Sequence, residues 1–253
     1  PWAKYRKNKG GIKMHTLVDL RGNLPVSVYL TSASVNDVKA LDDLYIEPSA
    51  IYLMDRGYVD FNRLFKLITK KNAFFVTRAK DNMLFEVVSE AEVDKSTGII
   101  SDERIKLTGL HTAKWYPEEL RMVTYEDYAT SKVYRFLTNN MEYEALTISE
   151  LYRERWNVEL YFKWIKQHLH IKSFYGTSEN AIYLQIWIAI CTYLLLAYAK
   201  KVMHIDQSLH TISKNVGLFL TDKTPLNELF NKAVPTEETE DWLYPSLFRP
   251  DDF

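Results

Sequence analysis

Two short apolar runs with a helical segment between them constrain the fold of this chain more than any other feature. The runs are AIYLMD at 50–55 and AFFVTRA at 73–79. Continuous apolar runs of this length are typical of parallel strands that are buried on both faces. Residues 61, 64, 65 and 68 between them are apolar, which is helical spacing. Strand, helix and strand make a right-handed βαβ unit, so we predict an α/β fold.

The segments before and after this unit predict further elements. IKMHTLVDL at 12–20 and LPVSVYLTS at 24–32 flank an RGN turn, which predicts an antiparallel hairpin. NDVKALDDL at 36–44 predicts a short helix capped by Asn36. KVYRFLTNN at 132–140 predicts a strand, and helices are expected over 147–170 and 206–220, with another beginning at Thr224.

Four parts follow from this pattern. Residues 1–80 and 133–203 are expected to form two parts of one core. Between 81 and 132, short strand-like pieces alternate with turn signals, which predicts a β-rich insertion. Residues 204–253 are expected to hold C-terminal helices and a mobile acidic tail.

Charge is distributed unevenly along the chain. The formal net charge is -1, which by itself argues weakly against a nucleic-acid-binding protein. However, residues 1–25 are strongly basic and residues 222–253 are strongly acidic, so the two ends cancel. A basic head could meet phosphates while an acidic tail stays solvated. Two solvated ends are an equally good interpretation of the charges alone.

Cysteine content and one long apolar stretch bear on the compartment. The single cysteine, Cys191, excludes an internal disulfide, so a reducing cytoplasm is expected. Residues 181–199 are uncharged and just long enough to span a membrane. Their aromatic residues are spread through the stretch and are not gathered at its ends, so we predict a core helix and no membrane partner.

One stripe of the helix around residue 159 combines cations with an acid and a phenol. At about 100° per residue, Tyr152, Arg155, Glu159, Lys163 and Lys166 share a narrow face ~21 Å long. This face suits a helix beside a phosphodiester backbone, with the cations on phosphates and the acid on a metal ion. The alternative is a row of surface ion pairs, because Arg155–Glu159 and Glu159–Lys163 both have i,i+4 spacing.

Asp55 ends the first apolar run. Ligands of open α/β sheets bind at the carboxyl ends of strands, which favours a functional role. The alternative is a turn or cap residue, with Gly57 permitting a sharp exit. Pairing with Glu159 favours the functional interpretation, because carboxylates from two distant segments can converge on Mg²⁺. One cysteine and scattered histidines make a structural zinc site improbable.

Tyr152, Arg155, Glu159 and Lys166 also fit the signature Y-x₂-R-x₃-E-x₆-K at every position. In this they resemble the DDE transposases of bacterial insertion sequences, of the insertion-sequence-four family. The segment MDRGYVDF at 54–61 resembles the surroundings of that family's second aspartate, and the resemblance covers most of residues 1–230.

This resemblance implies an RNase H-like fold, in which a mixed sheet with flanking helices is interrupted by a β-rich insertion. It implies cut-and-paste DNA transposition that depends on Mg²⁺, with Mn²⁺ as a substitute. Asp55 and Glu159 would be catalytic metal ligands. Tyr152, Arg155 and Lys166 would contact DNA, joined by Lys163 of the same stripe. Trp115, the one tryptophan of the insertion, is the candidate for stacking on a flipped base.

The partners implied are double-stranded DNA, as terminal inverted repeats and target, and a second copy of the chain, since both element ends are cut. The family's first aspartate would lie upstream of the segment that matches the start of this chain, and neither Asp19 nor Asp37 falls in its context. Because the chain begins at Pro1, we expect an N-terminal truncation that removes a strand beside Asp55 and leaves the chain inactive alone. The alternatives are a remnant that still binds DNA or the intact enzyme, and a metal-dependent nuclease that cuts without joining strands.

Overall fold

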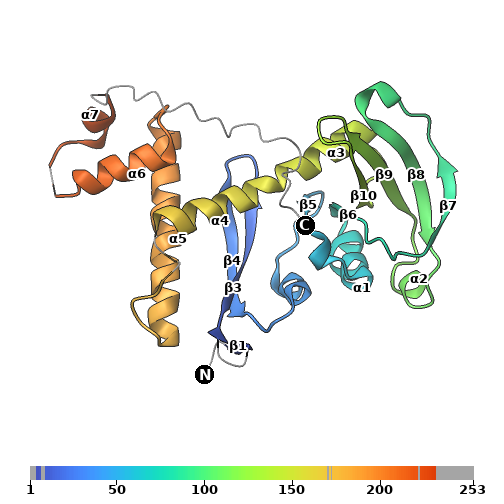
Figure 1. Cartoon of the computed structure of the whole chain (residues 1–253), viewed down its shortest axis with the longest axis horizontal. Helices are drawn as coiled ribbons and strands as arrows, with labels where there is room; N and C mark the ends of the chain where they lie inside the picture. The colour runs from blue at the N-terminus through green and yellow to red at the C-terminus, as the bar shows by residue number, and fades with distance from the viewer. Residues whose placement is uncertain (1–3, 7–8, 170, 172, 222, 232–253) are drawn as a thin grey trace.

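A six-stranded mixed sheet forms one end of the molecule (Figure 1). The computed structural model describes residues 4–6, 9–169, 171, 173–221 and 223–231. The strand order is β5-β6-β10-β9-β8-β7, with β5 and β6 parallel and all other neighbours antiparallel. The strands are β5 Ile51–Leu53, β6 Phe74–Arg78, β7 Phe85–Glu90, β8 Ile99–Leu107, β9 Leu120–Asp127 and β10 Lys132–Thr138.

The predicted strand–helix–strand unit is confirmed, although its helix is irregular. The connection begins as α1 (Phe61–Arg63), widens to a π turn (η3, Leu64–Ile68) and ends as a 3₁₀ turn (η4, Thr69–Lys71). Asp60 caps its start, because its carboxylate accepts a hydrogen bond from the Arg63 N–H at 3.0 Å. Leu64 and Ile68 are fully buried in the main hydrophobic core, so the apolar spacing places this connection against the sheet.

The predicted β-rich segment supplies β7, β8 and β9, and these strands continue the same sheet. A buried ion pair joins two of them, since Arg121 donates from Nε and Nη2 to Asp102 at 2.7 Å. The remaining nitrogen, Nη1, donates to the backbone carbonyls of Asn140 and Tyr143. Every side-chain nitrogen of Arg121 is therefore satisfied inside the protein.

The predicted antiparallel hairpin is also confirmed, as β3 (Ile12–Asp19) and β4 (Leu24–Ser32). It forms a sheet of its own, and a second small sheet pairs β1 (Lys4–Arg6) with β2 (Lys9–Gly10). The helix expected after the hairpin is a 3₁₀ helix, η1 (Asp37–Asp43), capped as predicted by the Asn36 side chain. Among the described strands β5 pairs only with β6, so it is an edge strand.

The single helix expected over 147–170 is wrong. The structure has α3 (Ala145–Glu154) and α4 (Trp156–His168), interrupted at Arg155, whose N–H donates to the Tyr152 carbonyl at 3.1 Å. No glycine or proline marks this break. The two halves have different neighbours, because α3 contacts the six-stranded sheet whereas α4 contacts α5 (Glu179–Val202). Tertiary packing therefore accompanies an interruption in a segment whose sequence favours one helix.

The predicted core helix, α5, is buried on one face only. Its buried residues are Ile186, Ala189, Ile190, Tyr193 and Leu196. The helix is long and apolar enough to cross a membrane, and 28% of its most apolar 18-residue window is buried. Beyond it lie α6 (Leu209–Leu218) and α7 (Leu226–Asn231). The acidic tail lies outside the described residues.

Candidate functional site

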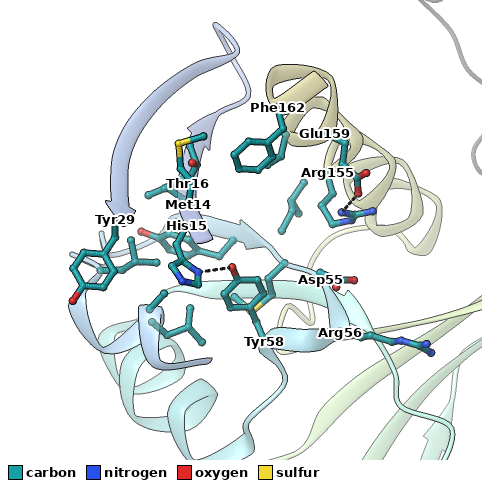
Figure 2. A pocket seen from close by; sticks show the side chains of 18 of the residues that line it. Met14, His15, Thr16, Tyr29, Asp55, Arg56, Tyr58, Arg155, Glu159 and Phe162 are labelled. Atoms are coloured by element: carbon teal, nitrogen blue, oxygen red, sulfur yellow. Dashed lines mark hydrogen bonds and ion pairs between the residues drawn. The ribbon is translucent and has the colours of Figure 1, made fainter. Parts of the chain in front are cut away.

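A cleft of about 820 Å³ lies between the β3–β4 hairpin, the end of β5 and the junction of α3 with α4 (Figure 2). All six site residues expected from the sequence line this cleft: Asp55, Tyr152, Arg155, Glu159, Lys163 and Lys166. Asp55 comes from a strand end and the other five come from a helical segment about a hundred residues later. The fold therefore brings the two distant segments together, and the break at Arg155 leaves the stripe facing one space.

Asp55 lies two residues after the end of β5 and stands at the cap position of a 3₁₀ turn, η2 (Arg56–Tyr58). Its side chain makes no capping hydrogen bond there and is exposed at the cleft. The exit from the strand does not depend on glycine, because Gly57 has no positive φ and an added Cβ would meet Asp55 at an ordinary 3.5 Å. The role expected for Gly57 is therefore wrong.

Glu159 and Arg155 form an ion pair at the edge of the cleft. Arg155 Nη1 lies 3.0 Å from Glu159 Oε1, and the two side chains are 21% and 46% exposed. The Nε of Arg155 is buried and has no hydrogen-bond partner among the described residues. One of the two surface pairs anticipated from spacing thus forms, and Arg155 keeps donors that are not used.

Lys163 and Lys166 are exposed on the next turns of α4. Within the described part of the chain neither lysine forms an ion pair, so the anticipated Glu159–Lys163 pair is absent. Lys166 Nζ lies 5.9 Å from the centre of the Phe162 ring. Both ammonium groups are therefore available to an anion in the cleft.

Tyr152 is the most enclosed residue of the stripe, with 2% of its surface exposed. Its ring centre lies 4.9 Å from that of Phe136 on β10, and burial raises the pKa of its hydroxyl. The Arg155 guanidinium lies 5.5 Å from the Tyr152 ring centre. Tyr152 thus packs α3 against the sheet, and its ring lies next to the guanidinium of Arg155.

Two arginines of the cleft were missed by the sequence reasoning. Arg78 ends β6, and its guanidinium lies 5.3 Å from the Tyr134 ring centre. Arg56 follows Asp55 and is half exposed. Arg78 could have been found, because β5 and β6 are parallel and their carboxyl ends meet at the same edge. With Arg155, Lys163 and Lys166 they outnumber the two acids, so the cleft favours an anionic ligand.

A buried polar chain ties the hairpin to the turn that carries Asp55. His15 on β3 lies 3.0 Å from the Thr31 hydroxyl and 3.3 Å from the Tyr58 hydroxyl. Tyr58 in turn donates its backbone N–H to the Asp55 carbonyl at 2.9 Å. Burial lowers the pKa of His15 and, with Asp37 and Asp55 nearby, raises the pKa of Tyr58 to about 12. Both side chains are therefore neutral near pH 7.

The acids of the cleft suit a hard divalent cation. Asp55 and Glu159 both line the space, and Mg²⁺ commonly takes one or two protein carboxylates together with water and phosphate oxygens. No group of three candidate metal ligands occurs among the described residues. Asp19 is bound to Arg21 and Asp37 to Lys13, and neither lines the cleft. Trp115 ends α2 (Thr112–Trp115), is stacked on His111 just before that helix, and does not line the cleft either.

Residues 1–195 match the family model described as "Transposase DDE domain". The chain belongs to this family. A transposase of Sinorhizobium fredii is 36% identical over 208 residues, which cover 81% of this chain and 58% of that protein. A transposase for an insertion sequence element of Geobacillus stearothermophilus is 29% identical, over 90% of this chain and 60% of its own length. A third transposase, from Synechocystis, is 26% identical over 84% of this chain and 57% of its own length.

This transposase DDE domain thus spans less than two thirds of the curated relatives it matches. No solved structure matches the chain significantly. The cleft is built within the matched residues, because each of its lining residues lies between 14 and 167.

Proposed function

We propose that this protein is a DNA transposase of an insertion sequence, which cleaves the element ends and transfers their strands in a metal-dependent reaction. The observation that carries the proposal is the convergence of Asp55 and Glu159 in one cleft with five cations. Family membership and the named relatives support the same assignment. We further propose an RNase H-like core, and the insertion-sequence-four subfamily on the basis of the Tyr152, Arg155, Glu159 and Lys166 spacing.

In the proposed reaction, the cations hold the DNA and the acids hold the metal. Arg155, Lys163 and Lys166 would bind phosphates along one strand. Asp55 and Glu159 would hold Mg²⁺, or Mn²⁺ in its place, and the bound ion would activate the attacking oxygen and stabilise the leaving one. Arg155 now neutralises Glu159. A phosphate that draws Arg155 away would release Glu159 for the metal, which couples DNA binding to metal binding.

The proposed partners follow from this reaction. They are double-stranded DNA, in the form of terminal inverted repeats and target, and a second copy of the chain, because an element has two ends. The proposed compartment is the cytoplasm, where the DNA of a bacterium lies.

A strand-transfer assay tests the proposal. The complete gene product that contains this sequence is incubated with a labelled element end, target DNA and Mg²⁺, and the products are separated by size. We expect both a cleaved end and a joined product, and neither without divalent metal. Cleavage with no joined product would replace the transposase with a nuclease, and no cleavage at all would reject an active enzyme.

A second candidate is a DNA-binding remnant without catalysis. It is favoured by the presence of only two cleft acids, with no group of three metal ligands, in the described part of the chain. Specific binding of the element end, combined with no cleavage by the complete gene product, would support it.

A further inference from the structure

The uncovered face of α5 carries a continuous apolar seam. Five of its side chains are between 54% and 69% exposed, and Cys191 among them is exposed as well. The seam consists of Leu184, Ile188, Cys191, Leu195, Tyr198 and Val202. At ~100° per residue these positions lie within about 40° of one line, directly opposite the buried face centred on Tyr193. A helix that is apolar all round is normally covered on both sides.

The spacing of the seam fits a helix as the partner. Successive seam residues are separated by four, three, four, three and four positions, which is the 3.5-residue repeat of helices that pack knobs into holes. This order reads the same in both directions. Two antiparallel copies therefore match layer by layer, with Leu184 opposite Val202, Ile188 opposite Tyr198 and Cys191 opposite Leu195.

The charges of α5 agree with antiparallel pairing. Glu179 lies in the first turn, and Lys200 and Lys201 lie in the last turn. In the antiparallel register above, Glu179 lies about 9–10 Å along the axis from Lys200 and Lys201 of the other copy, so the acidic end of each helix faces toward the basic end of its partner. A parallel pair would set like charges together. The residues beside the seam, such as Trp187, Thr192 and Ala199, are uncharged, so no like-charge repulsion opposes self-association.

From these observations we propose that α5 is a self-association surface, on which the α5 of a second copy packs antiparallel in the register centred on Tyr193. No other helix in the described residues presents a seam of this length. Figure 1 places α5 beyond the β3–β4 hairpin, on the side of the molecule away from the six-stranded sheet. The inference builds on the proposed function, because a dimer with two-fold symmetry offers one catalytic cleft to each of the two ends of an element.

The dimer expected from this seam is weak. A standard interface uses about 20–30 residues a side, whereas α5 has 24 residues and presents only one face. Association should therefore depend on concentration in the micromolar range.

Disulfide capture in the purified chain, without DNA, tests both the surface and the register. In the proposed pair, the two Cys191 residues are offset by about 6 Å along the axis as well as by the helix separation, so the natural cysteine should not bridge to itself. Leu195→Cys sets a new thiol opposite Cys191 of the other copy. We expect this variant to give a covalent dimer on oxidation, at least tenfold more than the unsubstituted chain.

Leu184→Cys is the matched control, because its thiol lies about 16 Å along the axis from the partner's Cys191. Both substitutions are at exposed positions, so folding should be retained. Equal capture by the two variants, or none by Leu195→Cys, would overturn the proposal. So would a monomeric chain whose α5 instead binds lipid vesicles.

Sedimentation gives an independent measurement. Ile188→Lys should shift the self-association constant at least tenfold toward monomer, whereas Leu110→Lys, at an 87% exposed position outside α5, should not. An unchanged constant in Ile188→Lys would contradict the seam. Neither experiment involves DNA or cleavage, so failure here leaves the proposed function untouched, and loss of catalysis would not remove the dimer.

Discussion

Arg121 and Arg155 each hold a carboxylate, but they do so in opposite ways. Arg121, in the sheet, uses all three side-chain nitrogens on Asp102 and two backbone carbonyls, and both partners are nearly buried. Arg155, at the helix junction, makes a single contact to Glu159, leaves its buried Nε without a partner in the described residues, and faces the cleft.

The difference separates an ion pair that holds the fold from one that is ready to exchange its partner. A saturated buried pair gains nothing from a new ligand, because every donor is already used. A partly exposed i,i+4 pair with a single contact contributes little to the stability of the fold, so its charges can be redirected to a phosphate or a metal at small cost. The contrast can be tested by matched substitutions.

The largest effect on stability is expected in the sheet. Arg121→Met leaves Asp102 charged and buried, which should lower the free energy of unfolding by about 3–5 kcal/mol. Arg155→Met breaks a partly exposed pair with a single contact and should lower the free energy of unfolding by less than about 1 kcal/mol. Urea denaturation of both variants measures the difference. Equal losses would show that the two pairs do not differ as the structure indicates.

DNA binding should depend on the cations of the cleft, although they contribute little to the stability of the fold. Arg155→Met, Lys163→Ala and Lys166→Ala should each weaken binding of an element end and reduce the slope of log K against log salt by about 0.9 per lost phosphate contact. Lys114→Ala, on exposed α2 and outside the cleft, is the control and should leave the slope unchanged. An unchanged slope in the three cleft variants would remove those residues from the phosphate contacts.

A smaller effect should follow pH through His15. Burial lowers its pKa in the folded state, so the unfolded chain binds more protons, and stability is lost as the pH falls below about 6.5. His15→Gln should flatten this loss between pH 7.5 and 5.5, above the range where carboxylates titrate. Urea midpoints at the two pH values check it. The same pH dependence in both proteins would exclude His15 as its source.

The smallest effect compares two aspartates of one loop. Asp60 caps the connection after β5 and binds Arg63, so Asp60→Ala should cost about 1 kcal/mol. Asp55 makes no capping bond, so Asp55→Ala should change the free energy of unfolding by less than about 0.5 kcal/mol. If Asp55→Ala costs as much as Asp60→Ala, Asp55 is a structural residue after all.

Much of the fold could be predicted because its signals are local. The apolar runs at 50–55 and 73–79 mark parallel strands, and the RGN turn marks the hairpin. The break at Arg155 could not be predicted, because it arises from the different neighbours of α3 and α4 and not from any breaker residue. The exposed seam of α5 could not be predicted either, because a helix that is apolar all round does not indicate which of its faces is buried.

The site was predicted in part. Helical spacing placed the stripe residues of α3 and α4 on one face, and Asp55 was selected because it ends a strand-like run. The structure brings both segments to one cleft. Arg78 and the His15–Tyr58 contact were missed, because they depend on how the hairpin and β6 meet in three dimensions. A single sequence offers no local pattern for such contacts.

The central claim is that Asp55 and Glu159 act together at one metal-dependent cleavage site. The most direct measurement compares Mg²⁺-dependent cleavage of a labelled element end by the complete gene product carrying Asp55→Asn, Glu159→Gln or the control Asp81→Asn. Asp81 is 86% exposed, is paired with Arg56 and Arg135, and does not line the cleft. We predict that the first two variants lose cleavage by at least about 100-fold while still binding DNA, and that Asp81→Asn cleaves normally. Near-normal cleavage by either Asp55→Asn or Glu159→Gln would contradict the account.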